Sequence, residues 1–475
     1  MIDRREIRDS ANTFGLRPQV VEKDYVLGWV LAGTYQHTAL RDTWIFKGGT
    51  CLKKCYFETY RFSEDLDFTV TDTSLINQEF LGAVFGEIGH WVYERTGIEI
   101  PQVLQNFDLF ENPRGSVSCQ GKLSYRGPIA PHSGGLPRIK LDLTLDELLV
   151  LPSVERVIFH DYSDAPAEGI MVRCYAYEEA FAEKARALGD RARPRDLYDV
   201  INLFRNTDAR PNSAVMHDVL RRKCGHRHLA VPTLAELEKH KGDLEGSWQP
   251  MLGHQLQALP PVESYWNALP EFFAWLETGV PPSMPTSYRM TAGETVLREP
   301  TLRLAVPATA RSHLEIIRFS GVNRLCVDLQ YQGSVRRIEP YSLRRTQDGN
   351  IVLHAIRASD GKHRSYRIDR IEGVQTTGQS YVPRYAVELS PQGRVAIVPS
   401  ATQSGSVARP RQPRRSTPSR PSRAGWSTGL RYIYECACCG KRFTRKTMTS
   451  QLNPHMDKSG FQCPGRAAIY VDTRH

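Results

Sequence analysis

The chain has 475 residues, of which 40% are hydrophobic and 24% are charged, and its formal net charge is +10 at pH 7. These values exclude a largely disordered chain, and the length predicts about three domains. The longest apolar stretch near the start, residues 25–33, is about half as long as a bilayer span, and the charged start precedes no apolar signal region, so we expect a cytoplasmic protein without membrane contact.

Cysteine usage divides the chain into two parts. Six of the ten cysteines are spread over the first 330 residues, and four crowd between Cys436 and Cys463. In a reducing compartment the first six are expected to be core thiols, and the last four indicate a metal site.

The pattern of apolar residues predicts an α+β protein. Residues 1–205 alternate between helical and strand-like segments, beginning with an amphipathic helix over residues 20–27 and a short strand over residues 43–46. Residues 206–279 are helical in pattern, and the proline-rich residues 281–286 end them, so we expect a helical extension over 206–285.

The sequence Phe46-Lys-Gly-Gly-Thr50 predicts a phosphate-binding turn. Glycines allow backbone amides to approach phosphate oxygens closely, and the N-terminus of the following helix favours negative charge. We therefore expect Gly48, Gly49 and Thr50 to hold the triphosphate of a nucleotide.

Three aspartates predict a divalent metal site. Asp65 and Asp67 are two residues apart, so both side chains lie on one face if this segment is a strand. Asp142, in Arg138-Ile-Lys-Leu-Asp142, would lie beside them if its strand pairs with theirs. An isolated Asp-x-Asp is more often a solvated strand edge, but the ordered combination with the Gly-Gly turn favours carboxylates that bind Mg²⁺ for phosphoryl transfer.

These motifs together resemble the AbiEii/AbiGii toxin family of nucleotidyltransferases over roughly residues 1–275. The resemblance rests on the following segments: Val21-Glu-Lys-Asp-Tyr-Val-Leu27, Gly48-Gly-Thr50, Arg61-Phe-Ser-Glu-Asp-Leu-Asp67, Lys140-Leu-Asp142, Tyr177-Glu-Glu-Ala-Phe-Ala-Glu-Lys-Ala-Arg-Ala-Leu188 and Arg195-Asp-Leu-Tyr-Asp199. It implies a polymerase-β-like nucleotidyltransferase core over 1–205, in which a small mixed sheet is flanked by helices and the helical extension follows.

The resemblance also implies residue roles. It makes Ser63 and Asp65 active-site residues, Asp67 a metal partner, Lys184 a triphosphate-binding lysine and Asp196 a further essential carboxylate, with Asp199 as its neighbour. Two alternatives stay open. Lys184 can instead be a solvated helix lysine paired with Glu183 or Glu179. The arginines Arg61, Arg191 and Arg195 can contact phosphate, or cap helices and pair with Asp196.

A small β-rich domain is predicted over residues 300–395, opening with a short helix over 313–318. Its basic Arg336-Arg-Ile-Glu-Pro340 and Arg364-Ser-Tyr-Arg-Ile-Asp-Arg-Ile371 are similar to the WYL domain, which implies an SH3-like fold. The Trp-Tyr-Leu of that domain is absent, and Asn350-Ile-Val-Leu353 stands in its place. Four arginines here either bind nucleic acid or pair with Glu339 and Asp369: Arg336, Arg337, Arg367 and Arg370.

The C-terminal part is predicted to be a basic flexible linker, residues 396–430, and a zinc-binding module, residues 431–475. Residues 405–425 contain six arginines and no acidic residue; such a segment is either a tether or a nucleic-acid contact. A zinc ribbon or knuckle is expected from four ligands, Cys436, Cys439, His455 and Cys463. The segment resembles zinc-binding domains related to SprT-type ribbons, and Lys441, Arg442, Arg445 and Lys446 give it a basic face.

The predicted function is transfer of a nucleoside monophosphate from an NTP, with Mg²⁺, to an RNA acceptor, with tRNA as the expected one. The family implies a toxin of a toxin–antitoxin or phage-defence system and a possible antitoxin partner. Two alternatives remain: transfer onto a protein side chain, or a nucleic-acid-binding regulator with a degenerate transferase.

Overall fold

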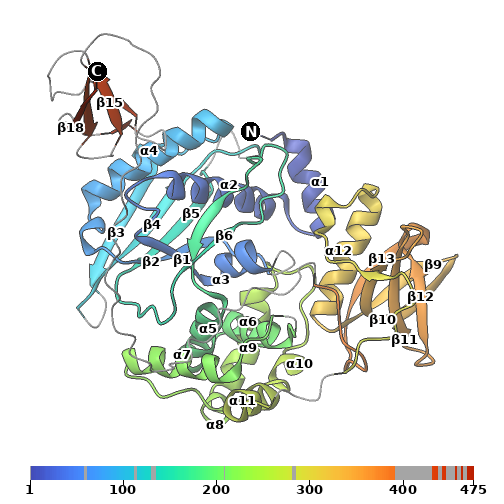
Figure 1. Ribbon diagram of the computed structural model, residues 1–475. Coiled ribbons are helices and arrows are strands. Elements are labelled where there is room, and N and C mark those ends of the chain that lie inside the picture. Colours follow the sequence, from blue (N-terminus) through green and yellow to red (C-terminus); the bar gives the residue numbers. More distant parts are fainter. Residues whose placement is uncertain are drawn as a thin grey trace, which may run out of the picture. The chain divides into compact units, whose positions relative to one another are not determined.

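The computed structural model describes residues 2–57, 61–111, 115–129, 135–207, 209–280 and 285–390, together with 431–436, 441–445, 455–456, 462–463 and 468–474 (Figure 1). Contacts divide the chain into two compact units, Met1–Tyr35 with Ala39–Ile397, and Gln36–Thr38 with Val398–His475. The predicted basic linker, residues 396–430, lies outside the described residues. In the described residues no helix is long and apolar enough to span a membrane.

A mixed seven-stranded sheet forms the centre of the first unit (Figure 1). Its strand order is β3 (Gln105–Glu111), β4 (Val117–Ser124), β5 (Arg138–Thr144), β2 (Asp65–Val70), β1 (Trp44–Lys47), β7 (Met171–Cys174) and β6 (Val154–Val157). The pairs β2–β5 and β1–β7 are parallel and the others are antiparallel. This mixed sheet is the kind that the resemblance implies.

Helices pack on this sheet through aromatic and small residues. The first helices are α1 (Arg4–Phe14), α2 (Pro18–Gln36) and α4 (Gln78–Thr96). Trp44 of β1 lies 5.9 Å from Phe85 of α4 between ring centroids, and Trp29 of α2 lies 6.3 Å from Trp91 of α4. A Cβ at Gly33 would lie 2.8 Å from a methyl carbon of Ile88, so glycine allows α2 and α4 to approach closely.

Helices follow the sheet along the chain. The helices α5 (Tyr177–Arg191) and α6 (Pro194–Arg205) lie within residues 1–205, the predicted core. Those within residues 206–285, the predicted helical extension, are α7 (Ser213–His226), α8 (Leu234–Glu238), α9 (Lys241–Leu252), α10 (Val262–Trp266) and α11 (Leu269–Thr278). The apolar anchors Trp248, Trp266, Phe272 and Trp275 are all buried among them.

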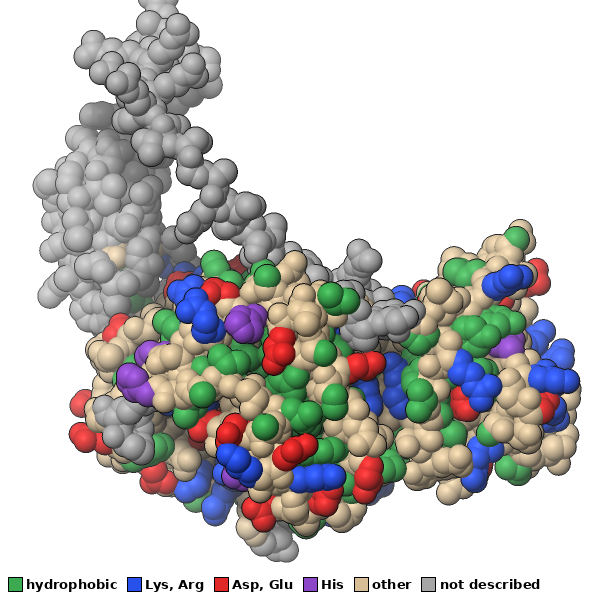
Figure 2. Space-filling model, turned by 90° about the horizontal axis from the view of Figure 1, so that it is seen from below, with side chains coloured by type: hydrophobic (Ala, Val, Ile, Leu, Met, Phe, Trp, Pro, Cys, Tyr) green, Lys and Arg blue, Asp and Glu red, His purple; other side chains and the backbone are tan. Residues whose placement is uncertain are grey.

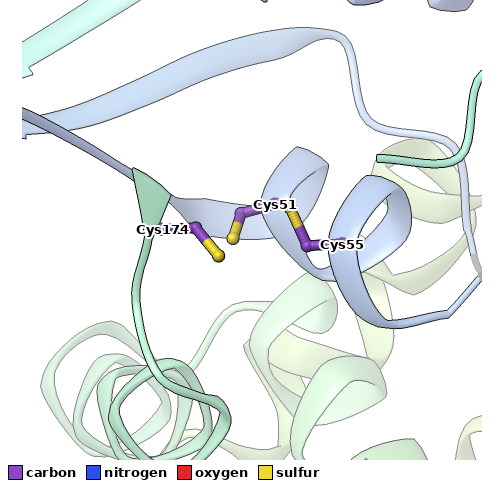
Figure 3. A group of neighbouring side chains, drawn as sticks. All are labelled: Cys51, Cys55 and Cys174. Atoms are coloured by element: carbon purple, nitrogen blue, oxygen red, sulfur yellow. The ribbon is translucent and has the colours of Figure 1, made fainter. Parts of the chain in front are cut away.

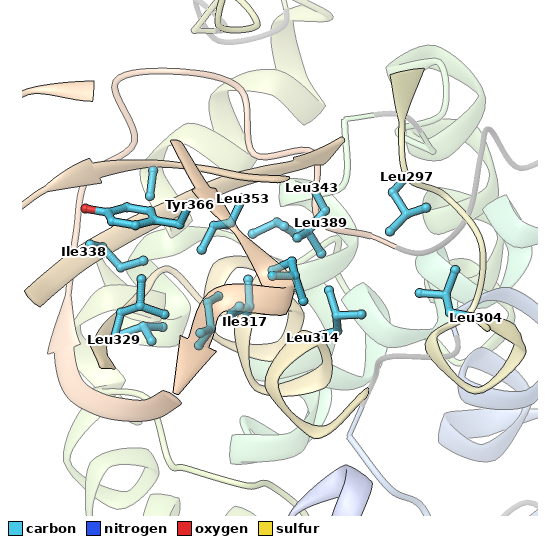
Figure 4. Close-up of a cluster of buried hydrophobic side chains, with 14 residues drawn as sticks. Leu297, Leu304, Leu314, Ile317, Leu329, Ile338, Leu343, Leu353, Tyr366 and Leu389 are labelled. Atoms are coloured by element: carbon cyan, nitrogen blue, oxygen red, sulfur yellow. The ribbon is translucent and has the colours of Figure 1, made fainter. Parts of the chain in front are cut away.

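The β module comprises α12 (Ala308–Val322) and strands β8 (Thr295–Val296), β9 (Leu325–Tyr331), β10 (Ser334–Arg345), β11 (Ile351–Arg357), β12 (His363–Arg367) and β13 (Ile371–Ser380). Its antiparallel strands run in the order β12, β11, β10, β9, β13, and β8 pairs with β10. The helix is longer than the predicted 313–318. Its Leu314 and Ile317 pack on the sheet in a continuous apolar core (Figure 4).

The second unit contains a three-stranded sheet in the order β15 (Arg442–Arg445), β14 (Arg431–Cys436), β18 (Ala468–Arg474). A short hairpin pairs β16 (His455–Met456) with β17 (Gln462–Cys463).

Candidate active site

The glycine turn lies directly against strand β2. Strand β1 ends at Lys47 and a short helix, α3 (Gly48–Cys51), begins at once. Gly48 has a φ of +83°, and a Cβ there would lie 2.0 Å from Oδ2 of Asp67. Thr50 donates a hydrogen bond of 2.5 Å from its hydroxyl to the carbonyl oxygen of Asp65. Only glycine therefore fits at position 48, both for conformation and for space.

The helix that follows differs from the regular helix expected after Thr50. From Leu52 to Tyr56 it is a π-helix, and the amide of Phe57 donates to the carbonyl of Leu52 over 2.9 Å. π-turns are uncommon and are frequent at functional sites.

Three aspartates converge on adjacent strands. Because β2 and β5 are parallel, Asp67 lies opposite Asp142, and Asp65 lies opposite Lys140. Burial and the charge of Asp142 raise the pKa of Asp67 to about 6. Burial and the charge of Asp65 also raise the pKa of Asp142. The three carboxylates therefore repel one another, as expected where a cation would be bound.

An open cavity of about 340 Å³ lies beside the glycine turn, and of the three aspartates Asp67 is the one that lines it. Lys47, Gly48, Asp67 and Lys184 line it, as do several charged groups that flank them: Glu147, Glu183, Arg186, Asp190, Arg191 and Arg227. The volume lies within the range of small-ligand sites.

Lys184 is held by a buried carboxylate rather than by Glu179 or Glu183. Its ammonium lies 2.8 Å from Oδ2 of Asp199, which is fully buried. Arg61 donates two hydrogen bonds to the same carboxylate, at 2.7 and 2.8 Å, and one of 3.0 Å to Gln255. Burial favours the neutral acid, but the charges of Arg61 and Lys184 outweigh it and hold the pKa of Asp199 below its usual range.

Asp196 lies behind the cavity wall. Arg191, which lines the cavity, donates to both oxygens of Asp196 at 2.7 and 3.0 Å. Both aspartates of α6 thus orient cationic side chains.

Ser63 lies beside Gly49, since a Cβ at Gly49 would be 3.1 Å from the hydroxyl oxygen of Ser63. The sequence left two roles open for Arg61: a phosphate contact, or helix capping and pairing with Asp196. In the structure Arg61 pairs with Asp199.

Some cavity residues were missed by the sequence analysis. Lys47 faces Asp67 across the β1–β2 pair and lies 3.5 Å from Glu147. Its position directly before Gly48 was a signal that could have found it. Arg227 forms an ion pair with Glu147, and Arg186 pairs with Glu183 at 2.6 Å. Arg186 lies two residues after Lys184, so the segment 177–188 was a signal for it as well. Arg227 follows α7 along the chain, and no local pattern predicts its approach to Glu147.

The arginines of the β module mostly make ion pairs and backbone contacts. Arg337 donates to Asp328 at 2.8 Å. Arg367 pairs with Asp369 at 2.7 Å, which is one of the two alternatives that the sequence left open. Glu339 instead accepts a hydrogen bond of 2.9 Å from Tyr341. Acidic and basic side chains are interspersed on the face shown in Figure 2, rather than gathered by sign.

Three of the four predicted zinc ligands meet in the second unit. One ligand atom from each of Cys436, His455 and Cys463 lies within 4.8 Å of the others, and the two sulfurs are 3.7 Å apart. The pairing of β16 with β17 sets His455 opposite Cys463. Cys439 lies outside the described residues.

Two solved structures are similar to parts of the chain. MenT4, a nucleotidyltransferase toxin from Mycobacterium tuberculosis H37Rv, is 19% identical, with a TM-score of 0.38 over 59% of this chain and 91% of that one. Proteasome accessory factor B/C of Arthrobacter aurescens is 13% identical, with a TM-score of 0.15 over 78% of this chain and 74% of that one. Both TM-scores are below 0.5, so neither similarity carries any argument about this chain. A search of curated proteins finds no match.

The family comparison covers the sheet and the helical extension. The model of the nucleotidyl transferase AbiEii toxin of type IV toxin–antitoxin systems matches residues 29–278, more than half of the chain. The match includes the glycine turn, the three aspartates and the Arg61–Asp199–Lys184 cluster. The chain therefore belongs to the AbiEii family and is a nucleotidyltransferase.

Proposed function

We propose that this protein is a toxin that transfers a nucleoside monophosphate from an NTP to an RNA acceptor, tRNA being the expected one. The observation that carries the proposal is that three carboxylates repel one another on adjacent strands, and that one of them, Asp67, lines a cavity of about 340 Å³ together with Lys47 and Lys184. Phosphoryl transfer needs oxygen ligands for divalent cations and positive groups for the phosphates, and both kinds of group lie here.

The carboxylates fit Mg²⁺ as a donor set. Asp65, Asp67 and Asp142 offer hard oxygen ligands on neighbouring strands, and their mutual repulsion is relieved by a divalent cation. Such an ion, when bound, neutralises the charge that develops on the transferred phosphoryl group.

The other side chains bind and orient the nucleotide. In this proposal Lys184 and Lys47 contact its phosphates, and the backbone amides of the turn at Gly48 donate hydrogen bonds to the phosphate oxygens. Asp199 positions Lys184, and Asp196 positions Arg191. Asp142 completes the set of carboxylates that would hold the ion.

Labelled NTPs test the acceptor directly. Purified protein is incubated with total tRNA and each labelled NTP in turn, with the Asp67→Asn variant as the control. Label in RNA supports the proposal. Label in protein favours transfer onto a side chain, and salt-dependent nucleic-acid binding without incorporation favours the regulator.

We also propose that the second unit binds zinc through Cys436, Cys439, His455 and Cys463. Thiolate and imidazole ligands on a paired hairpin support it, because structural zinc prefers such ligands. Together with the basic residues 396–430, this module is proposed to bind the phosphate backbone of the acceptor. The protein is proposed to act in the cytoplasm.

The β module is proposed to be a WYL-like, SH3-like domain, a proposal supported by its antiparallel strands and single packed helix. An antitoxin protein is the partner expected from the family's type IV toxin–antitoxin description.

A further inference from the structure

Three cysteines from separate segments meet behind the glycine turn. Cys51 ends α3, Cys55 lies in the π-helix, and Cys174 ends β7 (Figure 3). Their sulfurs all lie within 4.8 Å of one another, and all three side chains are at most 1% exposed. All three are among the six cysteines expected to be core thiols, and the pairing of β1 with β7 brings Cys174 to the other two.

An arginine and a tyrosine hydroxyl lie near this three-cysteine cluster. Arg156 of β6 donates a hydrogen bond of 2.8 Å to the carbonyl of Cys55, and its guanidinium lies 4.5 Å above the ring of Tyr56. The hydroxyl of Tyr56 lies 3.9 Å from the sulfur of Cys174 and donates to the carbonyl of Tyr175 at 2.6 Å. A cationic group and an oxygen therefore both adjoin the sulfurs.

The π-helix is the second unusual feature at this place. It extends from Leu52 to Tyr56, directly beside the sulfurs, and carries Cys55 within it. A π-helical turn is less favourable than a regular α-helical turn, so an interaction that compensates for it is expected here. A group bound between Cys51, Cys55 and Cys174 would provide one.

We propose that Cys51, Cys55 and Cys174 bind one soft metal ion, Zn²⁺ or Cu⁺, in a site separate from the carboxylates and from the second unit. Thiolates select soft ions of this class. Binding Zn²⁺ releases three protons from the thiols and leaves a net charge of −1, which faces Arg156, and no oxidation occurs. The ion ties the segment after Gly48-Gly-Thr50 to β7 and so holds the turn in place.

The test uses the full chain with Cys436→Ser and Cys463→Ser, which removes the proposed metal site of the second unit. Elemental analysis for zinc and copper then counts what the remainder holds. We expect about one equivalent of one of the two ions per chain. The further change Cys174→Ser should remove it, and Cys224→Ser, which replaces a buried cysteine outside the cluster, should leave it.

Metal absent from the Cys436→Ser/Cys463→Ser protein, or metal that persists after Cys174→Ser, overturns the proposal. A variant that fails to fold does not decide the matter, so the Cys436→Ser/Cys463→Ser protein is also titrated with Cd²⁺. Cadmium–thiolate absorption matching three thiolates is expected, and its absence contradicts the site. A disulfide found within the cluster after unfolding also contradicts it. None of these results depends on transferase activity.

Discussion

At the scale of single residues, the raised pKa of Asp67 couples activity to stability. Burial and the charge of Asp142 raise it to about 6, so the folded protein favours the protonated form. For an acid with a raised pKa, the free energy of unfolding falls as pH rises from about 4 to about 6 and stays reduced above that range.

We expect Asp67→Asn to lower the turnover rate by about a hundredfold or more, because it removes a carboxylate from the proposed metal site. Without divalent metal, the same change should stabilise the protein above pH 6 by roughly 1–3 kcal/mol, and by little below pH 4. Thermal unfolding in chelator at both pH values measures this, with the exposed Asp348→Asn as control. A variant less stable than the unmodified protein at pH 8 would contradict the repulsion.

Loss of the Lys184 side chain should change nucleotide use, whereas loss of the Asp199 carboxylate should change stability. Lys184→Ala should weaken NTP use most at limiting NTP, because it removes a phosphate contact, with exposed Lys239→Ala as the control. Asp199→Asn leaves Arg61 and Lys184 buried without their carboxylate, so we expect a loss of stability of about 3–5 kcal/mol. Steady-state kinetics and thermal unfolding measure the two effects. Equal kinetics for Lys184→Ala and Lys239→Ala would rule out the phosphate role.

At the scale of elements, a buried polar cluster joins the helical extension to α12. The hydroxyls of Tyr198 and Tyr265 donate to the side-chain oxygen of Asn323 at 2.8 and 2.6 Å. The amide of Asn323 donates to the carbonyl of Phe319 at 2.8 Å, so this side chain uses both of its groups.

Asn323→Leu should therefore destabilise the protein by about 2–4 kcal/mol, because two buried hydroxyls lose their acceptor. The exposed Asn106→Leu should have little effect. Urea unfolding followed by tryptophan fluorescence compares them. Equal midpoints would show that the cluster does not couple these helices.

The elements differ in how far the sequence predicted them. The strand from Asp65 to Val70 and its partner from Arg138 to Thr144 were predictable, because alternating residues and the two carboxylate motifs mark them locally. The approach of Cys174 to Cys51 was not, since it depends on parallel pairing between β1 and β7 over more than a hundred residues. The π-helix was also missed, because no local composition distinguishes it from an α-helix.

At the scale of the whole molecule, the proposed transferase residues all lie in the first unit. Truncation after residue 397, where the first unit ends, should leave nucleotide transfer to a small acceptor intact. Nucleic-acid affinity should fall and its dependence on salt should flatten, because arginines that neutralise phosphates are removed. Binding measured at several salt concentrations tests this. An unchanged salt slope would favour a protein partner for the second unit.

The repulsion among Asp65, Asp67 and Asp142 has a consequence for the lifetime of the protein in a cell. Without a bound cation, this repulsion destabilises the folded chain. Binding of the cation removes the repulsion and adds its binding free energy to the stability of the folded state. Proteases degrade chains largely through their opened states. The protein without metal and nucleotide should therefore be degraded faster than the protein that has bound both. Pulse proteolysis with and without Mg²⁺ and NTP should show the difference, and abundance in the cell would then follow nucleotide supply.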